Sequence, residues 1–165
     1  EGGYRVPAIA WMPGTIKKGT VSKAIASTLD LYPTLIAMTG NEISNQEELD
    51  GLNIKNTFVN NEPVRHDIHY YRQDTLIGIR HKEWKMYIKD PNPWNDDLTE
   101  EDMPVLYNIE HDPSEKYNIA DKNSDIVNRI VTLSKEHIQK VTKISSKYDA
   151  ILPEYQSAYD AYNKK

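Results

Sequence analysis

Hydrophobic and polar positions follow two different patterns along the chain, and the change falls near residues 60–63. Residues 1–58 contain a nearly continuous apolar run and a stretch with helical spacing, which is typical of an α/β layer. Residues 59–165 contain short β-rich runs and then a long stretch of helical periodicity, which predicts an antiparallel sheet followed by a helix. We therefore expect the end of a large α/β domain and a small α+β subdomain.

The first part depends on one predicted strand and one predicted helix. Residues 6–12 are almost all apolar and stop at a Pro-Gly pair, as in a strand that helices cover on both faces. Apolar spacing predicts a helix that starts after Asp30, its expected N-cap, and stops before Gly40. Because such a strand needs partners along both edges, we expect this part to belong to a larger sheet.

The second part predicts a small sheet packed by a long helix. Turn-like polar residues separate the β-rich runs, which indicates a four-stranded antiparallel sheet within about 66–110. The runs are 69–72, 76–80, 84–88 and 106–109. Apolar residues then recur at steps of three and four, which predicts an amphipathic helix over about 124–148. Pro153 lies in the Tyr-rich tail, residues 149–165.

Composition narrows the classes of partner and chemistry. The net charge of −5 over 165 residues argues against broad binding to nucleic acid or to anionic membranes. There is no cysteine, so the chain holds no disulfide, thiolate metal ligand or cysteine nucleophile. The 5 histidines include no pair at the helical spacing of a zinc site, so no metal site is predicted. No apolar run reaches the roughly 18 to 20 residues that a membrane-spanning helix needs.

Five short motifs occur in an order that resembles the sulfatase family, of the arylsulfatase A-like type. The first is E-G-G-Y-R-V-P at residues 1–7, and the last is L-Y-N-I-E-H-D-P-S-E-K-Y-N-I-A at 106–120. The motifs between them are L-D-L-Y-P-T-L at 29–35, L-D-G at 49–51 and R-H-K-E-W-K at 80–85. Together they resemble the carboxyl-terminal part of such an enzyme.

The resemblance implies a parent enzyme of the alkaline-phosphatase-like α/β class that hydrolyses sulfate esters. This chain would supply the last strand and helix of the large domain and the whole small subdomain. Family members use calcium and a formylglycine made from Cys or Ser in C/S-x-P-x-R, and this sequence lacks that motif. The resemblance therefore places both cofactors, and a sulfate-contacting lysine just before Glu1, in a missing N-terminal sulfatase domain. It also implies a sulfated small molecule or carbohydrate as substrate and a periplasmic, secreted or lysosome-like parent.

Candidate residues for substrate contact are present, but no catalytic residue is predicted in this chain. His69, Tyr71 and Arg72 are expected at a strand end, and Trp94 lies in a Pro-rich loop where an indole can stack on a sugar or aryl group. The resemblance places the small subdomain along one side of the cleft, which favours these four residues. Trp94 could equally anchor its own loop.

A second set of residues is expected to support the site without touching substrate. Glu1, Gly2 and Gly3 would shape the backbone just after the upstream lysine. Arg5 would pair with carboxylates to fix that turn, and Asp30 would cap its helix. The aromatic residues expected on the packing face against the long helix are Trp84, Tyr87 and Tyr107.

Three functions are consistent with these observations. In the first, the chain is a sulfatase fragment, inactive alone, that supplies scaffold and one wall of the substrate cleft. In the second, the parent is a related phosphoester or phosphonate hydrolase of the same superfamily, which the upstream nucleophile motif would distinguish. In the third, the chain is a noncatalytic interaction module whose partner binds the exposed face of the long helix.

Overall fold

The computed structural model describes residues 2–45, 49–91 and 98–141. The chain forms two compact units, Glu1–Val127 and Asn128–Lys165, with the boundary inside the last described helix. The division that the sequence predicts near residue 58 lies within the first unit and stays a prediction.

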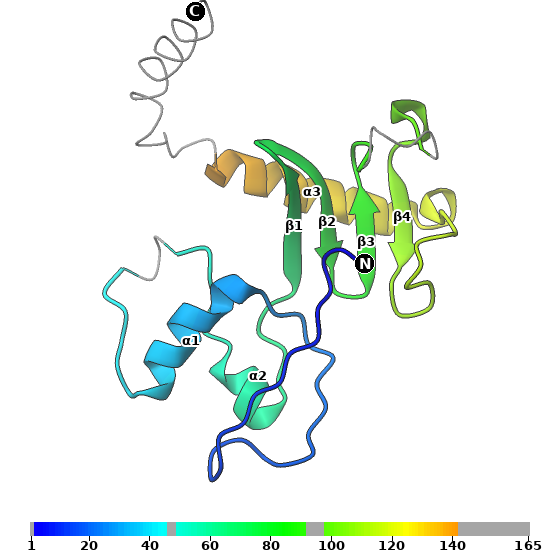
Figure 1. Cartoon of the computed structure of the whole chain (residues 1–165). Helices are drawn as coiled ribbons and strands as arrows, with labels where there is room; N and C mark the ends of the chain where they lie inside the picture. The colour runs from blue at the N-terminus through cyan, green and yellow to red at the C-terminus, as the bar shows by residue number, and fades with distance from the viewer. Residues whose placement is uncertain (1, 46–48, 92–97, 142–165) are drawn as a thin grey trace, which may run out of the picture. The chain divides into compact units, whose positions relative to one another are not determined.

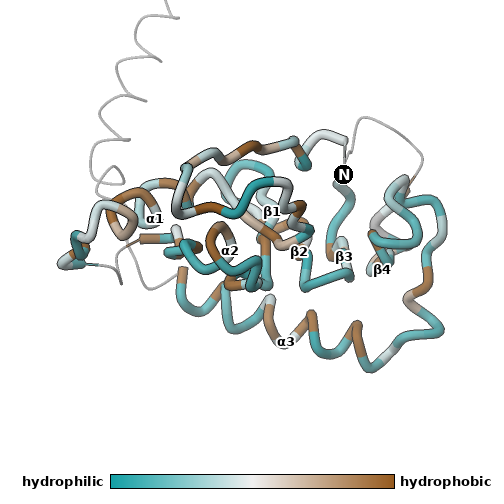
Figure 2. Tube along the Cα trace, turned by 90° about the horizontal axis from the view of Figure 1, so that it is seen from below, coloured by the Kyte–Doolittle hydropathy of each residue, from teal (hydrophilic) through white to brown (hydrophobic). Residues whose placement is uncertain are grey.

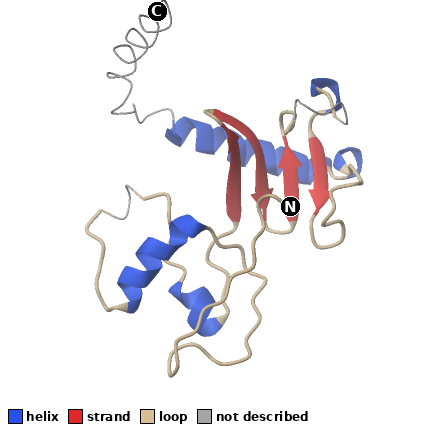
Figure 3. Ribbon diagram, viewed as in Figure 1, coloured by secondary structure: helices blue, strands red, loops and turns tan. Residues whose placement is uncertain are grey.

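The first unit contains a four-stranded antiparallel sheet in the order β1-β2-β3-β4 (Figure 1). Its strands are β1 (Asp67–Arg72), β2 (Thr75–His81), β3 (Trp84–Tyr87) and β4 (Val105–Asn108). Two-residue turns join the first three strands, and their first residues, Gln73 and Lys82, take a left-handed backbone with φ of 56° and 53°. The predicted four-stranded meander is confirmed (Figure 3).

The register of the sheet divides its side chains between two faces. One face is fully buried at three partnered positions, which are Ile79, Met86 and Leu106. Lys85, Tyr87 and Tyr107 lie on the opposite face, because Lys85 pairs with Tyr107 and residues two apart on a strand share a face. Trp84 lies three positions from Tyr87 and so shares the face of Met86. The prediction that Trp84 packs on one face with Tyr87 and Tyr107 is therefore wrong.

Helix α3 (Ser124–Val141) begins at the residue that the apolar periodicity predicts. The backbone carbonyl of Asn123 accepts the amide of Val127 at 3.0 Å, and Ile130 and Ser134 are buried. The remainder of the predicted helix to residue 148 and the tail at 149–165 lie outside the described residues.

Two short helices precede the sheet, α1 (Leu31–Met38) and α2 (Lys55–Asn60). Pro33 lies in the first turn of α1, where its missing N–H removes no intrahelical hydrogen bond, and Gly40 follows the helix with φ of 81°. The predicted helix is confirmed. The hydrophobic pattern does not predict α2, which ends at Asn61 in the left-handed region.

The predicted strand over residues 6–12 is absent. The segment has no strand pairing and runs as an exposed loop along the first unit (Figure 1), with apolar positions that Figure 2 marks in brown. Val6 is 71% exposed, Ile9 98% and Trp11 85%. An apolar run becomes a strand only when neighbouring strands satisfy its backbone groups, and no described residue pairs with this segment. The strand is therefore not formed among the described residues, and the larger sheet to which the prediction assigns it stays a prediction.

Candidate functional site

Polar side chains from the sulfatase-like motifs take part in two largely buried clusters. One lies on the sheet, and the other lies at the N-terminus of α1. We call them the Lys85 cluster, made by Lys85, Glu115 and three tyrosine rings, and the Asp30 cluster, made by Asp30, Arg65 and the chain around residues 50–52. Neither cluster contains a catalytic arrangement. Among the described residues, no group of three or more His, Asp and Glu side chains could hold a metal ion.

The Lys85 cluster buries a charged ammonium group on one face of the sheet. Lys85 is wholly buried, and its Nζ donates a hydrogen bond to Glu115 Oε1 at 2.8 Å. The same Nζ lies 4.8 Å from the ring centroid of Tyr70, 5.0 Å from that of Tyr87 and 5.3 Å from that of Tyr4. Ring faces at these distances attract a cation, so the tyrosines stabilise the charge that burial disfavours.

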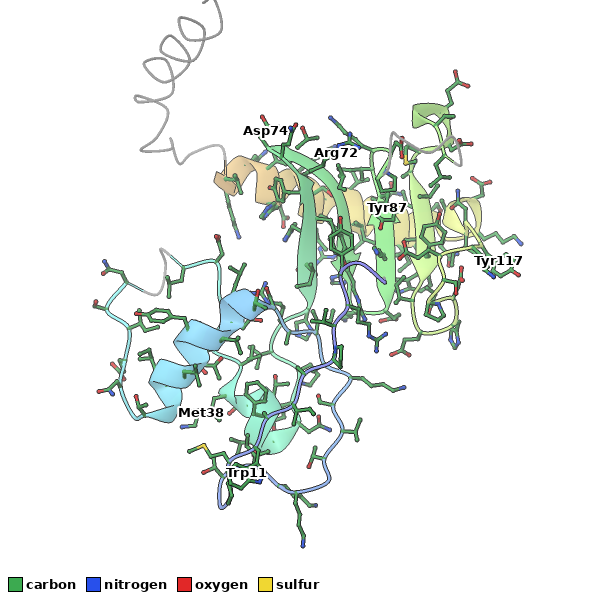
Figure 4. The ribbon with its side chains drawn as sticks, viewed as in Figure 1. Trp11, Met38, Arg72, Asp74, Tyr87 and Tyr117 are labelled. Atoms are coloured by element: carbon green, nitrogen blue, oxygen red, sulfur yellow. The ribbon has the colours of Figure 1, made fainter. Side chains whose placement is uncertain are left out.

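Glycine at position 78 makes room for this arrangement. In the sheet register, Gly78 lies between Tyr70 on β1 and Tyr87 on β3, whose ring centroids are 6.5 Å apart. A Cβ at Gly78 would lie 2.8 Å from the Tyr87 ring and 2.7 Å from the Met86 carbonyl oxygen. Glycine therefore allows the two rings to close over the strand between them. Tyr87 is labelled on β3 in Figure 4.

Charge interactions in the Lys85 cluster shift two pKa values. Burial alone would raise the pKa of Glu115, but hydrogen bonding and positive charge, with Lys85 as the largest source, outweigh it and hold the pKa below its ordinary value. Burial, with smaller contributions from Glu115 and Asp112, raises the pKa of Tyr107. Glu115 therefore remains ionised and Tyr107 remains a neutral hydrogen-bonding group near pH 7.

The Asp30 cluster ties three separated segments together. Asp30 is wholly buried and accepts hydrogen bonds from Ser27 N and Leu52 N, each at 2.8 Å. Arg65 Nε donates to Asp30 Oδ2 at 2.9 Å, and Arg65 Nη2 also donates to the Asp50 carbonyl at 2.9 Å. Burial alone would raise the pKa of Asp30, but Arg65 and the two amides hold it below its ordinary value.

Asp30 has a different role from the predicted helix cap. It occupies the N-cap position of α1 but makes no side-chain capping bond to that helix. Ser27 instead caps the preceding short 3-10 turn, Thr28–Asp30, in a reciprocal pair with Asp30. The Asp30 carboxylate therefore binds Arg65 instead. The sequence analysis did not identify Arg65, because no motif or local spacing around residue 65 indicates a partner for Asp30.

The predicted substrate contacts lie on β1, apart from Trp94, which is outside the described residues. His69 is a half-buried residue in the middle of β1, where a strand end was expected. Tyr71 is 37% exposed beside an irregularity in the β1–β2 pairing, and burial together with the charge of Asp50 raises its pKa. Arg72 ends the strand, and its Nη1 donates to the Asp90 carbonyl at 2.9 Å (Figure 4).

Three of the predicted supporting residues, Gly2, Gly3 and Arg5, lie in an exposed turn at the start of the described chain. Gly2 and Gly3 are exposed, and Glu1 is outside the described residues. Arg5 is exposed and forms no ion pair with a residue in the described part of the chain. Its predicted carboxylate partner is therefore not found here. Tyr4, which no prediction singled out, makes the contact between this turn and the sheet.

Large apolar side chains before α2 form an exposed set that we call the apolar surface. Its members are Val6, Ile9, Trp11, Val21, Leu29, Leu31, Tyr32 and Leu35, with exposed fractions from 47% to 98%. A shallow hollow of about 390 Å³ lies beside part of it, lined by Leu29, Tyr32, Pro33 and the L-D-G residues at 49–51. Large apolar side chains are more often buried, and the exposure of this set contrasts with the buried apolar face of the sheet.

None of the described helices is long and apolar enough to cross a lipid bilayer.

Comparison with known proteins gives the family. Residues 63–160, more than half of the chain, match the family described as the C-terminal region of aryl-sulfatase. N-acetylgalactosamine-6-sulfatase of Mus musculus is 27% identical over 83% of this chain and 31% of its own length. Arylsulfatase A of Bos taurus is 28% identical over 92% of this chain and 32% of its own length.

Solved structures agree with the sequence comparison. The crystal structure of the PsFucS1 sulfatase from Pseudoalteromonas sp. superposes with a TM-score of 0.69 at 20% identity, covering 82% of this chain and 30% of that one. The likeness supports the alkaline-phosphatase-like sulfatase fold. The chain spans about a third of the length of the curated relatives above. With its ordered motifs and its four-stranded sheet, the chain belongs to the sulfatase family and corresponds to the carboxyl-terminal region of an aryl-sulfatase.

Proposed function

We propose that this chain is the carboxyl-terminal part of an enzyme that hydrolyses sulfate esters. In this proposal it supplies scaffold and one wall of the substrate cleft and is inactive alone. Family membership supports the reaction class, and two relatives carry the names N-acetylgalactosamine-6-sulfatase and arylsulfatase A. The substrate class would be a sulfated carbohydrate or aryl sulfate.

The apolar surface is the observation that carries the proposal. All of its residues precede the family-matched region at 63–160, and all except Val21 lie in the segments that the resemblance assigns to the last strand and helix of the large domain. Burying one such side chain stabilises a contact by about 1.5 to 3 kcal/mol. A surface of this kind fits an upstream catalytic domain that covers it and pairs with residues 6–12 as a strand.

The chemistry of the reaction would reside in that upstream domain. The family suggests calcium and a formylglycine residue, but the residues of this chain do not fit either group. The sequence has no cysteine and no Ser-x-Pro-x-Arg, and the described residues offer no acidic cluster for a metal ion. This chain would instead fix the turn at residues 2–5 and present polar side chains to the substrate.

Tyr71 is the strongest of the proposed substrate contacts. Its side chain is partly exposed, and a phenol is protonated at neutral pH, so it can donate a hydrogen bond to a sulfate or sugar oxygen. Arg72, His69 and Trp94 are proposed to line the same wall. A Tyr71→Phe change in the full enzyme should raise KM severalfold with little change in stability, and an unchanged KM for several sulfate esters would remove Tyr71 from the wall.

A complementation assay tests the proposed function. The upstream region is co-expressed with this chain and with a formylglycine-generating enzyme, and hydrolysis of p-nitrophenyl sulfate is measured. We expect hydrolysis only when both parts are present, and less with a chain carrying Ile9→Gln and Trp11→Gln. Full activity of the upstream region alone, or hydrolysis of the phosphate or phosphonate analogue in preference to the sulfate, would contradict it.

A further inference from the structure

We infer that Lys85 is a positioning residue, which fixes the turn at residues 2–5 on the sheet through the ring of Tyr4. This inference goes beyond scaffolding in general, and its consequence for catalysis rests on the proposed function. One buried charge would be the contact between the sheet and the turn at residues 2–5, which under the proposed function leads to an upstream domain.

Four separate segments contribute to the Lys85 cluster, whose rings and carboxylate form a cage around the ammonium group. Tyr70 comes from β1 and Lys85 with Tyr87 from β3, while Glu115 lies beyond β4 and Tyr4 lies in the exposed turn. Tyr4 also packs on Tyr70, with ring centroids 4.5 Å apart. Three of the four segments belong to the sheet and its following loop. The fourth segment is the turn at residues 2–5, and the contacts of Tyr4 in this cluster hold it on the sheet.

Burial of the charge makes the position of Tyr4 matter. The Lys85 side chain is wholly buried, so the cage leaves water no access to its charge. A buried ammonium is stable only while its partners remain in place. Displacing Tyr4 would open one wall and expose the ion pair to water, which couples the turn to the Lys85–Glu115 contact. Tyr4 itself is 52% exposed, and its ring lies against Tyr70 and the Lys85 ammonium.

Under the proposed function, the turn leads directly to the catalytic side of the cleft. The sulfatase-like motif at residues 1–7 contains Tyr4, the motif at 80–85 contains Lys85, and the motif at 106–120 contains Glu115. One residue from each of three motifs that are far apart in sequence therefore lies at the same buried ammonium group. Small displacements of positioning groups lower catalytic rates strongly, so loss of this contact should affect turnover more than stability.

Limited trypsin digestion of the 165-residue chain tests the contact itself. Cleavage after the exposed Arg5 should accelerate about tenfold when Tyr4→Leu removes the ring, and also when Lys85→Met with Glu115→Gln removes both charges. The double change avoids leaving one buried charge unpaired. Tyr4→Phe is the matched control, because it keeps the ring and should cleave at the parent rate.

The exposed residues Lys17 and Lys18 provide an internal control in the same digest. Their cleavage should not change in any variant, whereas general unfolding would accelerate every site. An unchanged rate after Arg5 in the Lys85→Met, Glu115→Gln chain, or equal acceleration at Arg5, Lys17 and Lys18, would overturn the inference.

Kinetics of the full-length enzyme test the consequence for catalysis. The double variant should lose about tenfold in kcat for p-nitrophenyl sulfate with KM and the unfolding midpoint nearly unchanged. In a Lys85→Ala enzyme, added propylammonium should restore part of kcat and neutral propanol should not. A double variant with parental kcat, or equal rescue by propanol, would contradict positioning by the charge. If the parent enzyme hydrolyses no sulfate ester, the proposed function is wrong. The trypsin digestion still tests whether Lys85 holds Tyr4, because it does not depend on activity.

Discussion

The segment before β1 and the sheet that follows it are stabilised in different ways. The sheet has a closed apolar face, with Ile79, Met86 and Leu106 wholly buried. The preceding segment has its best contacts in polar groups, above all the buried Asp30 with Arg65, and exposes most of its large apolar side chains. A segment that is anchored by polar contacts and exposes its apolar residues fits the proposed upstream domain, which would cover those residues.

The largest effect should come from breaking the polar anchor. Replacing Asp30 with Ala leaves Arg65 partly buried without its carboxylate, and should lower the free energy of unfolding by about 3 to 5 kcal/mol. Urea denaturation measures the loss. Asp50→Asn is the matched control with almost no expected loss, because Arg65 uses the backbone carbonyl of Asp50. Equal losses of unfolding free energy in the two variants would show that the Asp30–Arg65 contact does not account for the loss.

The same anchor predicts a pH dependence. The pKa of Asp30 in the folded chain is below the ordinary value of 3.8, so its contribution is fully present above that value. It is lost as pH falls through the lower folded pKa, where Asp30 takes up a proton. Asp30→Asn should therefore flatten the acid limb of stability against pH below about pH 4. If the Asp30→Asn chain loses stability below this pH as steeply as the parent chain, Asp30 is not the cause of that loss.

The closed face of the sheet should respond nearly as strongly. Leu106→Ala creates a cavity among fully buried neighbours and should cost about 2 to 5 kcal/mol. Leu35→Ala removes the same atoms from a side chain that is 59% exposed, and should cost less than about 0.5 kcal/mol. Urea denaturation measures both losses of unfolding free energy. Similar losses at both positions would mean that apolar burial does not stabilise the sheet more than the preceding segment.

A smaller effect should follow from adding a methyl group at the L-D-G motif. A Cβ at Gly51 would lie 2.0 Å from the carbonyl oxygen of Leu29, so Gly51→Ala forces the backbone apart and should cost about 1 to 3 kcal/mol. Gly2→Ala meets nothing within 4 Å and is the control. Thermal denaturation compares them, and a neutral Gly51→Ala would show that the approach of these segments is not close.

The smallest effect in the chain alone should occur at Trp11. Trp11 is 85% exposed, so Trp11→Gln should change the free energy of unfolding of the 165-residue chain by less than about 0.5 kcal/mol. In the proposed full-length enzyme the same change should cost about 3 to 5 kcal/mol, because the upstream domain would then bury the indole. A small cost in both settings would contradict a covered apolar surface.

Local signals in the sequence were sufficient for the strands and the start of α3. Alternation with tight polar turns marks β1 to β3, and steps of three and four mark α3 from Ser124. The failures concern distant partners. Residues 6–12 have the composition of a strand, but pairing depends on other chain segments, and the face of Trp84 follows from a register that composition does not reveal.

The two buried clusters show the same limit. Asp30 and Arg65 are 35 positions apart, and Lys85 and Glu115 are 30 apart, so no local spacing pairs them. The family resemblance pointed to the motifs that contain Asp30, Lys85 and Glu115 without giving their contacts. A charged residue such as Lys85 between aromatic and apolar neighbours in a short strand is the signal that could have drawn attention to a buried pair.

Hydrogen exchange at residues 6–12 is the most direct measurement of the central claim. The account predicts that these amides exchange at unprotected rates in the 165-residue chain and become protected by about a thousandfold or more in the full-length enzyme, as an interior strand requires. The amides of Ile79 and Met86 should be protected in both and serve as the reference. Rapid exchange at 6–12 in the full-length enzyme would contradict the account.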